Sequence, residues 1–136
     1  MIHFPPRIAA VTDVFLTKSF QRWRVKERLP DRVLCAAIDE MERGLIDANL
    51  GGGLYKKRVA RTGAGKSGSY RVLIAVRFGE RAIFVFGFGK NERDNIDRRE
   101  ERALKAYARV LLGLDSAQMA RALRAGEWIR LRCDDG

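Results

Sequence analysis

Apolar residues recur at helical spacing in the first half of the chain. After Asp31, a candidate N-cap, intervals of four, three and four place one stripe along a helix, formed by Leu34, Ile38, Met41 and Leu45. A shorter helix is predicted before it, beginning after Thr17 or Ser19 and ending before Pro30. Both segments are amphipathic, so each is expected to pack against a sheet.

Two further helices are predicted in the second half. One begins near Asn95 or Asp97 and ends before Gly113, and its apolar face is formed by Leu104, Tyr107, Ala108, Leu111 and Leu112. The other is capped by Ser116 and runs to Leu123. The four helices therefore flank a central region without helical periodicity.

That central region shows the alternation of β-strands. Strands are predicted at residues 8–15, 54–60, 70–78, 82–88 and 128–131. The three middle strands follow one another closely and are expected to be antiparallel, which predicts an α+β fold with a small, mostly antiparallel sheet and helices packed on one face. Alternation puts Arg71 and Arg77 on the face opposite Val72 and Ile74, so the arginine face is expected to be the open, working surface.

The length of 136 residues suits a single domain over residues 1–136. No run approaches the roughly 18 apolar residues that span a bilayer, and the N-terminus lacks the apolar centre of a signal peptide, so a cytoplasmic protein is expected. The two cysteines, Cys35 and Cys133, have no metal-ligand spacing. Cys35 is interpreted as plain core, and no disulfide is expected.

Positive charge is concentrated in the middle of the chain. The net charge is +10, and residues 54–109 hold 15 of the 27 lysines and arginines but only 6 of the 17 acidic residues. Between Leu54 and Phe78 there is no acidic residue and there are seven basic ones: Lys56, Lys57, Arg58, Arg61, Lys66, Arg71 and Arg77. Like charges repel, so a polyanionic partner is expected to offset them, and nucleic acid is the commonest.

The segment GAGKSG at residues 63–68 has some likeness to a phosphate-binding loop. The full pattern needs a glycine where this chain has Ala60, and it needs a buried strand before the loop and a helix after it. Here a cationic strand precedes the segment and a second strand follows. The pattern therefore favours the turn of a basic hairpin.

Few residues offer acid–base or metal chemistry. The single histidine, His3, lies near the terminus, and no carboxylate pair has a spacing that suggests a metal site. A cluster of cations suits phosphoryl transfer, in which charge develops on phosphate oxygens. The arginine side chain stays protonated in proteins and cannot accept a further proton. A proton acceptor in the cluster would therefore be Lys56, Lys66 or Lys90. From the residues alone, catalysis and simple binding of phosphates are equally open.

Two stretches carry a family resemblance: GGGLYKKRVARTGAGKSGSYRVLIA, from residue 51, and FVFGFGKNERDNI, from residue 84. Together they resemble the RelE/HigB family of toxins from bacterial type II toxin–antitoxin systems. The similarity covers about residues 15–112, which leaves 113–136 as an extension. It implies a small α+β domain without a cofactor that cleaves messenger RNA on the ribosome and is held inactive by a cognate antitoxin protein.

The resemblance also implies site residues. Its catalytic positions fall on Lys56, Arg58, Arg71 and Lys90. Lys56 and Arg58 would bind the scissile phosphate, and Arg71 would stabilise the transition state. Further RNA-binding residues are expected at Lys57, Arg61, Lys66, Arg77 and Arg93.

The chain departs from RelE at two positions. RelE has a further arginine and a downstream tyrosine around its site, and this chain has Asn91 and Asp97 at the aligned positions. The proton donor is therefore left open. Tyr70 is expected to be core, because it shares a strand face with Val72 and Ile74.

Two other functions are compatible with the sequence. A ParE-like toxin shares the fold but inhibits gyrase by binding, without catalysis. A simple RNA-binding module would need only the basic hairpin. An assay of messenger RNA cleavage on ribosomes separates these alternatives from a nuclease.

Overall fold

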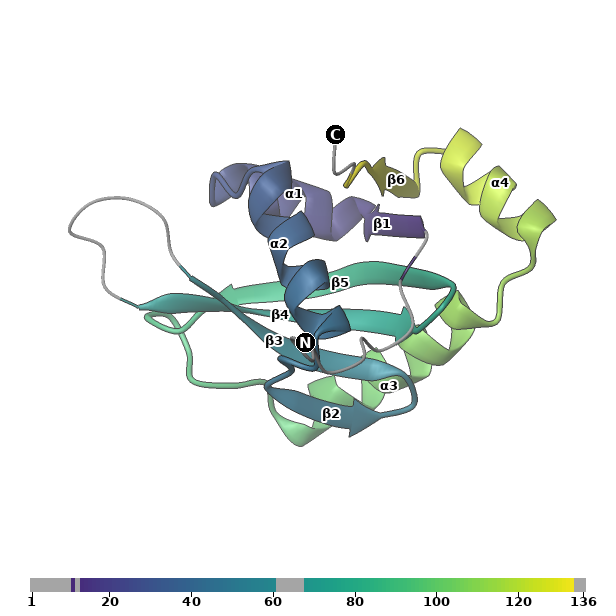
Figure 1. Cartoon of the computed structure of the whole chain (residues 1–136). Coiled ribbons are helices and arrows are strands. Elements are labelled where there is room, and N and C mark those ends of the chain that lie inside the picture. Colours follow the sequence, from purple (N-terminus) through teal and green to yellow (C-terminus); the bar gives the residue numbers. More distant parts are fainter. Residues whose placement is uncertain (1–10, 12, 61–67, 134–136) are drawn as a thin grey trace, which may run out of the picture.

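The computed structural model describes residues 11, 13–60 and 68–133, and these residues form one sheet with helices packed on it (Figure 1). The strands are β1 (Asp13–Thr17), β2 (Ala48–Gly51), β3 (Leu54–Ala60), β4 (Ser69–Arg77), β5 (Arg81–Gly89) and β6 (Trp128–Leu131). The helices are α1 (Lys18–Lys26), α2 (Asp31–Glu42), α3 (Arg98–Leu112) and α4 (Ser116–Arg124). The strand order is β2-β3-β4-β5-β1-β6, and β1 is parallel to β5 while the other neighbours are antiparallel. The predicted α+β class and mostly antiparallel sheet are confirmed.

Helices cover both faces of the sheet, so the expectation that they gather on one face is wrong. Val72 and Ile74 of β4 belong to the hydrophobic cluster that contains α1 and α2. Leu73 and Ala75 belong to a second cluster that contains α3. Figure 1 shows α2 on one side of the sheet and α3 on the other. The reason is that successive residues of β4 are all apolar here, and each face needs its own cover to exclude water.

The basic segment is a hairpin. β3 and β4 pair in antiparallel register from Leu54 opposite Ala75 to Ala60 opposite Ser69, with the glycine-rich segment joining them. This pairing confirms the hairpin and rules out a phosphate-binding loop, which would be followed by a helix. The turn at residues 61–67 itself lies outside the described residues.

An additional strand, β2, was not predicted. It pairs with the start of β3 through a turn in which Gly51, Gly52 and Gly53 have φ of 90°, 65° and 85°. Left-handed φ values in three consecutive residues suit glycine alone. The glycine triplet is thus the turn of a second hairpin.

The predicted caps of α1 and α3 are confirmed. The hydroxyl oxygen of Thr17 accepts a hydrogen bond from the backbone N–H of Phe20 at 3.2 Å. Asp97 accepts one from the N–H of Glu100 at 2.8 Å, and the Glu100 side chain accepts from Asp97 in return. This reciprocal capping box satisfies two N–H groups that a helix start would otherwise leave unpaired.

Other helix boundaries differ from the expectation by one or a few residues. The N-caps are Pro30 and Asp115, where Asp31 and Ser116 were expected. Leu45 lies beyond the end of α2 and is 57% exposed, so it is not part of the buried stripe.

Within the described part of the chain, no helix has both the length and the apolar character needed to cross a membrane.

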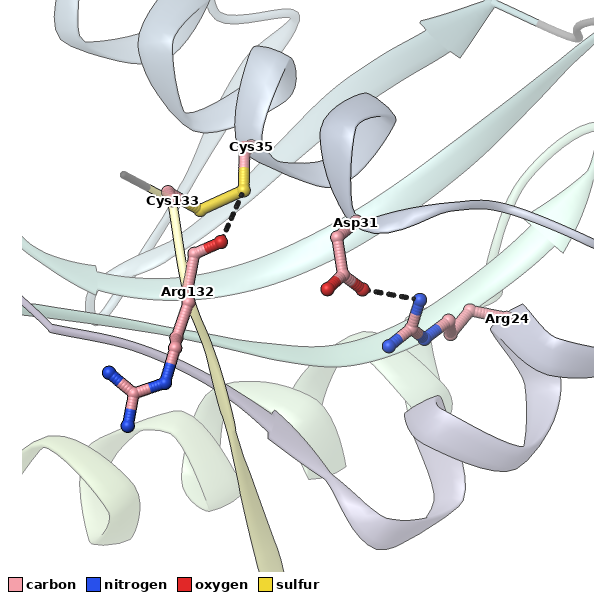
Figure 2. Close-up of a disulfide and its surroundings, with 5 residues drawn as sticks. All are labelled: Arg24, Asp31, Cys35, Arg132 and Cys133. Carbon is pink, nitrogen blue, oxygen red and sulfur yellow. Dashed lines mark hydrogen bonds and ion pairs between the residues drawn. A yellow bond between two sulfur atoms is a disulfide. The ribbon is translucent and has the colours of Figure 1, made fainter. Parts of the chain in front are cut away.

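The two cysteines form a disulfide, so the expectation of unpaired cysteines is wrong. Cys35 of α2 is bonded to Cys133, just after β6, with the two Cα atoms 5.4 Å apart (Figure 2). Nearby, Arg24 of α1 pairs with Asp31 of α2 at 2.7 Å. The cysteines are 98 residues apart in sequence, and only the folded chain brings them together. The bond fixes the C-terminal end of the sheet to α2.

Reducing this disulfide is expected to lower the free energy of unfolding by about 2–4 kcal/mol, because a cross-link over about 100 residues restricts the unfolded chain. Urea denaturation with and without a reductant measures the change. Cys133→Ser should have the lower stability under both conditions and should not respond to the reductant. Equal stability of the natural protein with and without reductant would contradict the prediction.

Candidate functional site

Two arginines and one aromatic ring form a row across the middle of the sheet. Arg58 of β3 lies opposite Arg71 of β4, and Arg71 lies opposite Phe88 of β5. These residues share the sheet face on which α3 packs, since Leu73 and Phe88 are in the α3 cluster. Arg58 is exposed and the Arg71 side chain is 19% exposed, so α3 leaves this end of the face accessible.

The segment after β5 brings two more cations to this end. The backbone N–H of Lys90 bonds to the carbonyl of Ser69 at 2.8 Å, which continues the β4–β5 ladder beside Arg71. The Lys90 ammonium donates to the carbonyl of Asp94 at 2.8 Å. The guanidinium of Arg93 lies over the ring of Phe88, with its carbon 5.5 Å from the ring centre. Phe88 thus links Arg93 to the row.

We refer to five residues as the cationic cluster: Lys56, Arg58, Arg71, Lys90 and Arg93. Lys56 is included because it lies two positions before Arg58 on the same strand face. The four residues expected to be catalytic are therefore together, and Arg93 joins them. They come from β3, β4 and the segment that follows β5.

The structure places other predicted site residues elsewhere. Lys57 lies on the opposite strand face, where its side chain is 7% exposed and its ammonium pairs with Glu40 of α2 at 2.6 Å. Arg77 is at the far end of β4, about 20 Å from Arg71 at the usual rise per residue. Arg61 and Lys66 lie outside the described residues.

Carboxylates of this chain neutralise part of the positive charge on the hairpin. The sequence alone predicts only an external polyanion in this role. Three carboxylates from outside the hairpin supply the ion pairs Glu40–Lys57, Asp47–Arg71 and Glu80–Arg77. Lys56 and Arg58 have no such pair within residues 11, 13–60 and 68–133. The hairpin charge that no carboxylate offsets among the described residues is therefore in the cationic cluster, where it is free to bind an anion.

Sequence reasoning missed the residues that hold the arginines in place. Arg71 contacts Asp47, whose carboxylate oxygen is 3.5 Å from its Nε, and donates to the hydroxyl of Ser69 at 2.7 Å. Arg93 donates from Nη1 to Glu100 at 3.1 Å and from Nη2 to the other carboxylate oxygen. The Arg93–Glu100 pair was within reach of sequence reasoning, because the two residues flank the predicted start of a helix. No local signal connects Asp47 to Arg71.

The Arg93–Glu100 pair changes the ionisation of both groups. Hydrogen bonding to Arg93 holds the pKa of Glu100 below its ordinary value, and hydrogen bonding to Glu100 raises the pKa of Arg93. The pair is bidentate, which fixes the plane of the guanidinium as well as its position. Arg93 is thereby held in a fixed orientation over the Phe88 ring.

Groups that could move a proton are few. Tyr70 is 3% exposed and packs edge-on against Trp23 at 5.4 Å between ring centres, which confirms its core position. Tyr107, expected on the apolar face of α3, is 42% exposed instead. Asp97 is occupied as the N-cap of α3. Besides arginine, the titratable side chains of the cluster are Lys56 and Lys90, and the carboxylates that contact its arginines are Asp47 and Glu100.

A groove lies near the cluster, but the described residues hold no group of potential metal ligands. Arg58 also borders a groove of about 300 Å³ between α2 and β3, lined mainly by small apolar side chains such as Ala36, Ala37 and Val59. Among the residues that the structure describes, no three His, Cys, Asp or Glu side chains are grouped so as to hold a metal ion. The cluster is thus the strongest candidate site for an anionic ligand.

Comparison with protein families agrees with this geometry. The family model described as the RelE toxin of the RelE/RelB toxin–antitoxin system matches residues 12–131. The chain belongs to the RelE toxin family. No curated protein matches it. Membership makes this RelE-family protein the toxin component of a toxin–antitoxin system, with a cognate antitoxin as partner.

The match includes every member of the cationic cluster and most of the α3 face. Of the two positions at which this toxin departs from RelE, Asn91 is exposed and Asp97 has a structural role as a helix cap. The cap explains why an aspartate is useful there, since its oxygen satisfies a free N–H of α3. The cationic cluster itself consists of lysines and arginines.

Glu100→Gln is expected to reduce stability in a pH-dependent way, because glutamine can keep the capping box but carries no charge. A carboxylate whose pKa is lowered by folding contributes its full stabilisation when the pH is above its ordinary pKa of 4.5. That stabilisation is lost as the pH falls through the lowered pKa of the folded protein. The difference in unfolding free energy between the natural toxin and the variant should therefore be largest near neutral pH and should shrink as the pH falls below the ordinary pKa of 4.5. Denaturation at a series of pH values measures it, and a difference that does not change with pH would contradict the ion pair.

Proposed function

We propose that this RelE-family toxin is a ribosome-dependent endoribonuclease that cleaves messenger RNA. The chain's own lysines and arginines would take the part that metal ions have in many nucleases. The ribosome would hold the RNA strand in the geometry that attack requires. The cognate antitoxin would keep the activity in check.

The proposed reaction begins with attack by a ribose 2′-oxygen on the adjacent phosphorus. A bond forms between that oxygen and phosphorus, and the bond from phosphorus to the 5′-oxygen of the next nucleotide breaks. The 2′-hydroxyl loses its proton to a base, and the leaving 5′-oxygen gains one from an acid. Negative charge develops on the phosphate oxygens in between, and fixed cations stabilise it.

The positions of the cations suggest their roles. Lys56 and Arg58, which are not neutralised by a carboxylate among the described residues, would bind the scissile phosphate. Arg71, at the centre of the row, would stabilise the transition state. Lys90 and Arg93 would hold the flanking backbone, and Lys56 or Lys90 would transfer the proton.

One observation carries the proposal. Cations from three separate parts of the chain converge on the end of the sheet face that α3 leaves accessible, and the two described hairpin cations with no carboxylate partner, Lys56 and Arg58, are both among them. A set of cations that served only to hold the fold would be paired, as Lys57 is with Glu40. Bound phosphate is the charge that such an arrangement accommodates.

Arg71→Ala is expected to lower cleavage of messenger RNA on purified ribosomes by about a hundredfold or more, as for loss of one transition-state donor. Primer extension on the cleaved RNA measures the rate. The variant should fold, because Arg71 is on a polar strand position and adds little to the core. Cleavage at the natural rate by folded Arg71→Ala would remove Arg71 from the site.

The same assay tests the proposal as a whole. Absence of cleavage by the natural toxin, together with inhibition of gyrase, would show a ParE-like function. Binding of RNA without either activity would show an RNA-binding module. Site-specific cuts that require the ribosome support the nuclease.

Arg58→Ala and Arg77→Ala form a matched pair for locating the RNA surface, since each removes one arginine from the same hairpin at opposite ends. Contact with about five phosphates predicts a slope near 3.5 for log affinity against log salt with single-stranded RNA, and loss of one contact lowers it by about 0.7. We expect this reduction for Arg58→Ala and a smaller one for Arg77→Ala. Equal slopes for the two variants, measured by fluorescence anisotropy, would show that the cluster is not the preferred surface.

A further inference from the structure

Asp47 is an acidic residue beside the cationic cluster. It lies in the segment between α2 and β2, and its backbone N–H bonds to the carbonyl of Lys56 at 3.1 Å, which fixes it to the outer edge of β3. Its side chain reaches Arg71 on the next strand, with 3.5 Å between Oδ2 and Nε. Since Arg71 projects from the α3 face of the sheet, the carboxylate lies on the same face as the cluster.

The hydrogen bonds of Arg71 show what this contact does. On one side, Nε faces Asp47. On another, Nη1 donates to the hydroxyl of Ser69 at 2.7 Å and approaches the carbonyl of Tyr70 at 3.4 Å. Within the described residues, Nη2 has no partner. The planar guanidinium is thus held on two sides and keeps its two Nη2 protons available for a ligand.

Asp47 does not favour the binding of RNA. A carboxylate beside phosphate-binding groups repels a phosphate, so it weakens the attraction of Lys56, Arg58 and Arg71 for RNA. What Asp47 does stabilise is the arrangement of the neighbouring cations. Arg58 lies opposite Arg71, and like charges in such a pair repel each other. Asp47 offsets that repulsion and gives the Arg71 side chain a fixed direction.

We propose that Asp47 is a positioning residue of this toxin, which holds Arg71 so that Nη2 faces the phosphate being cleaved. The inference rests on the proposed nuclease function, because Arg71 needs a precise direction only if it acts in a transition state. A displacement of about 1 Å at a reacting group can lower a rate by about a hundredfold. Asp47 therefore acts on the reaction through Arg71.

Two assays on Asp47→Ala should give changes of opposite sign. Cleavage on ribosomes should fall by about tenfold to a hundredfold, because Arg71 loses its direction. Affinity for a single-stranded RNA with 2′-O-methyl groups, which is not cleaved, should rise a few-fold, because one negative charge is gone. Asp47→Asn should show a smaller loss of cleavage, since the amide oxygen can still accept from Nε. A merely structural role would lower both quantities together with thermal stability, and that result would overturn the proposal.

Two controls test whether the effect belongs to Asp47 and to its contact with Arg71. Glu101→Ala removes a carboxylate that pairs at 3.4 Å with Lys105 of the same helix, a residue outside the cationic cluster, and should leave cleavage unchanged. In an Arg71→Ala background, Asp47→Ala should cause no further loss of cleavage, since residues that act through one another are not additive. A further loss of tenfold or more in that background would show that Asp47 acts by itself, for example as a base, and would overturn the positioning role.

The NMR signal of the Arg71 Nε–H gives a readout that does not depend on activity. In the natural toxin this signal should be shifted and slow to exchange with water, and in Asp47→Ala it should move to the position of a free arginine. An unchanged signal overturns the proposal even if the toxin is a nuclease. A changed signal in a toxin that cleaves no RNA would confirm the contact and reject the proposed function instead.

Discussion

The central strand β4 must be covered on both faces, and the rest of the structure is arranged around this constraint. Val72, Leu73, Ile74 and Ala75 are all 0% exposed, although alternate residues point to opposite sides. The helices α1 and α2 cover one side and α3 covers the other. Because α3 packs over Leu73 and Ala75, the end of the strand that carries Arg71 is left for polar groups. The candidate site is located where the hydrophobic cover ends.

The cations of the hairpin are divided between structure and binding by the strand face they occupy. Lys57 points toward α2, where desolvation makes an unpaired charge costly, and Glu40 neutralises it. Arg58 points toward the open end of the other face and remains exposed. Between these extremes, Arg71 is half-buried and held by Asp47 and Ser69. Burial thus decides which cations are occupied by the fold and which are available to an anion.

The segment that follows β5 serves both the fold and the candidate site. Asp97 caps α3, and Glu100 of the same capping box also holds Arg93. One short segment therefore starts a helix and orients a cation of the site. Under the proposed function, proton transfer in this toxin falls to lysines, while arginines supply the electrostatic stabilisation on which phosphoryl transfer chiefly depends.

The sequence by itself determined the elements that depend on neighbouring residues. Periodicity located the stripe of α2, alternation assigned Val72 and Arg71 to opposite faces of β4, and side-chain chemistry narrowed each of two helix starts to a pair of residues that includes the observed cap, Thr17 or Asp97. It also showed that the hairpin is basic. These properties are local, because hydrogen bonding and side-chain direction in helices and strands repeat over a few residues.

Tertiary structure decided which distant residues meet. It joined Cys35 to Cys133 and brought Glu40 to Lys57 and Asp47 to Arg71. It also put α3 on the face that was expected to be open. None of these contacts has a local signal, since each depends on how the apolar faces of the helices are buried against a sheet that is apolar on both sides. Sequence determined which residues carry charge, and packing determined which of those charges remain free to act.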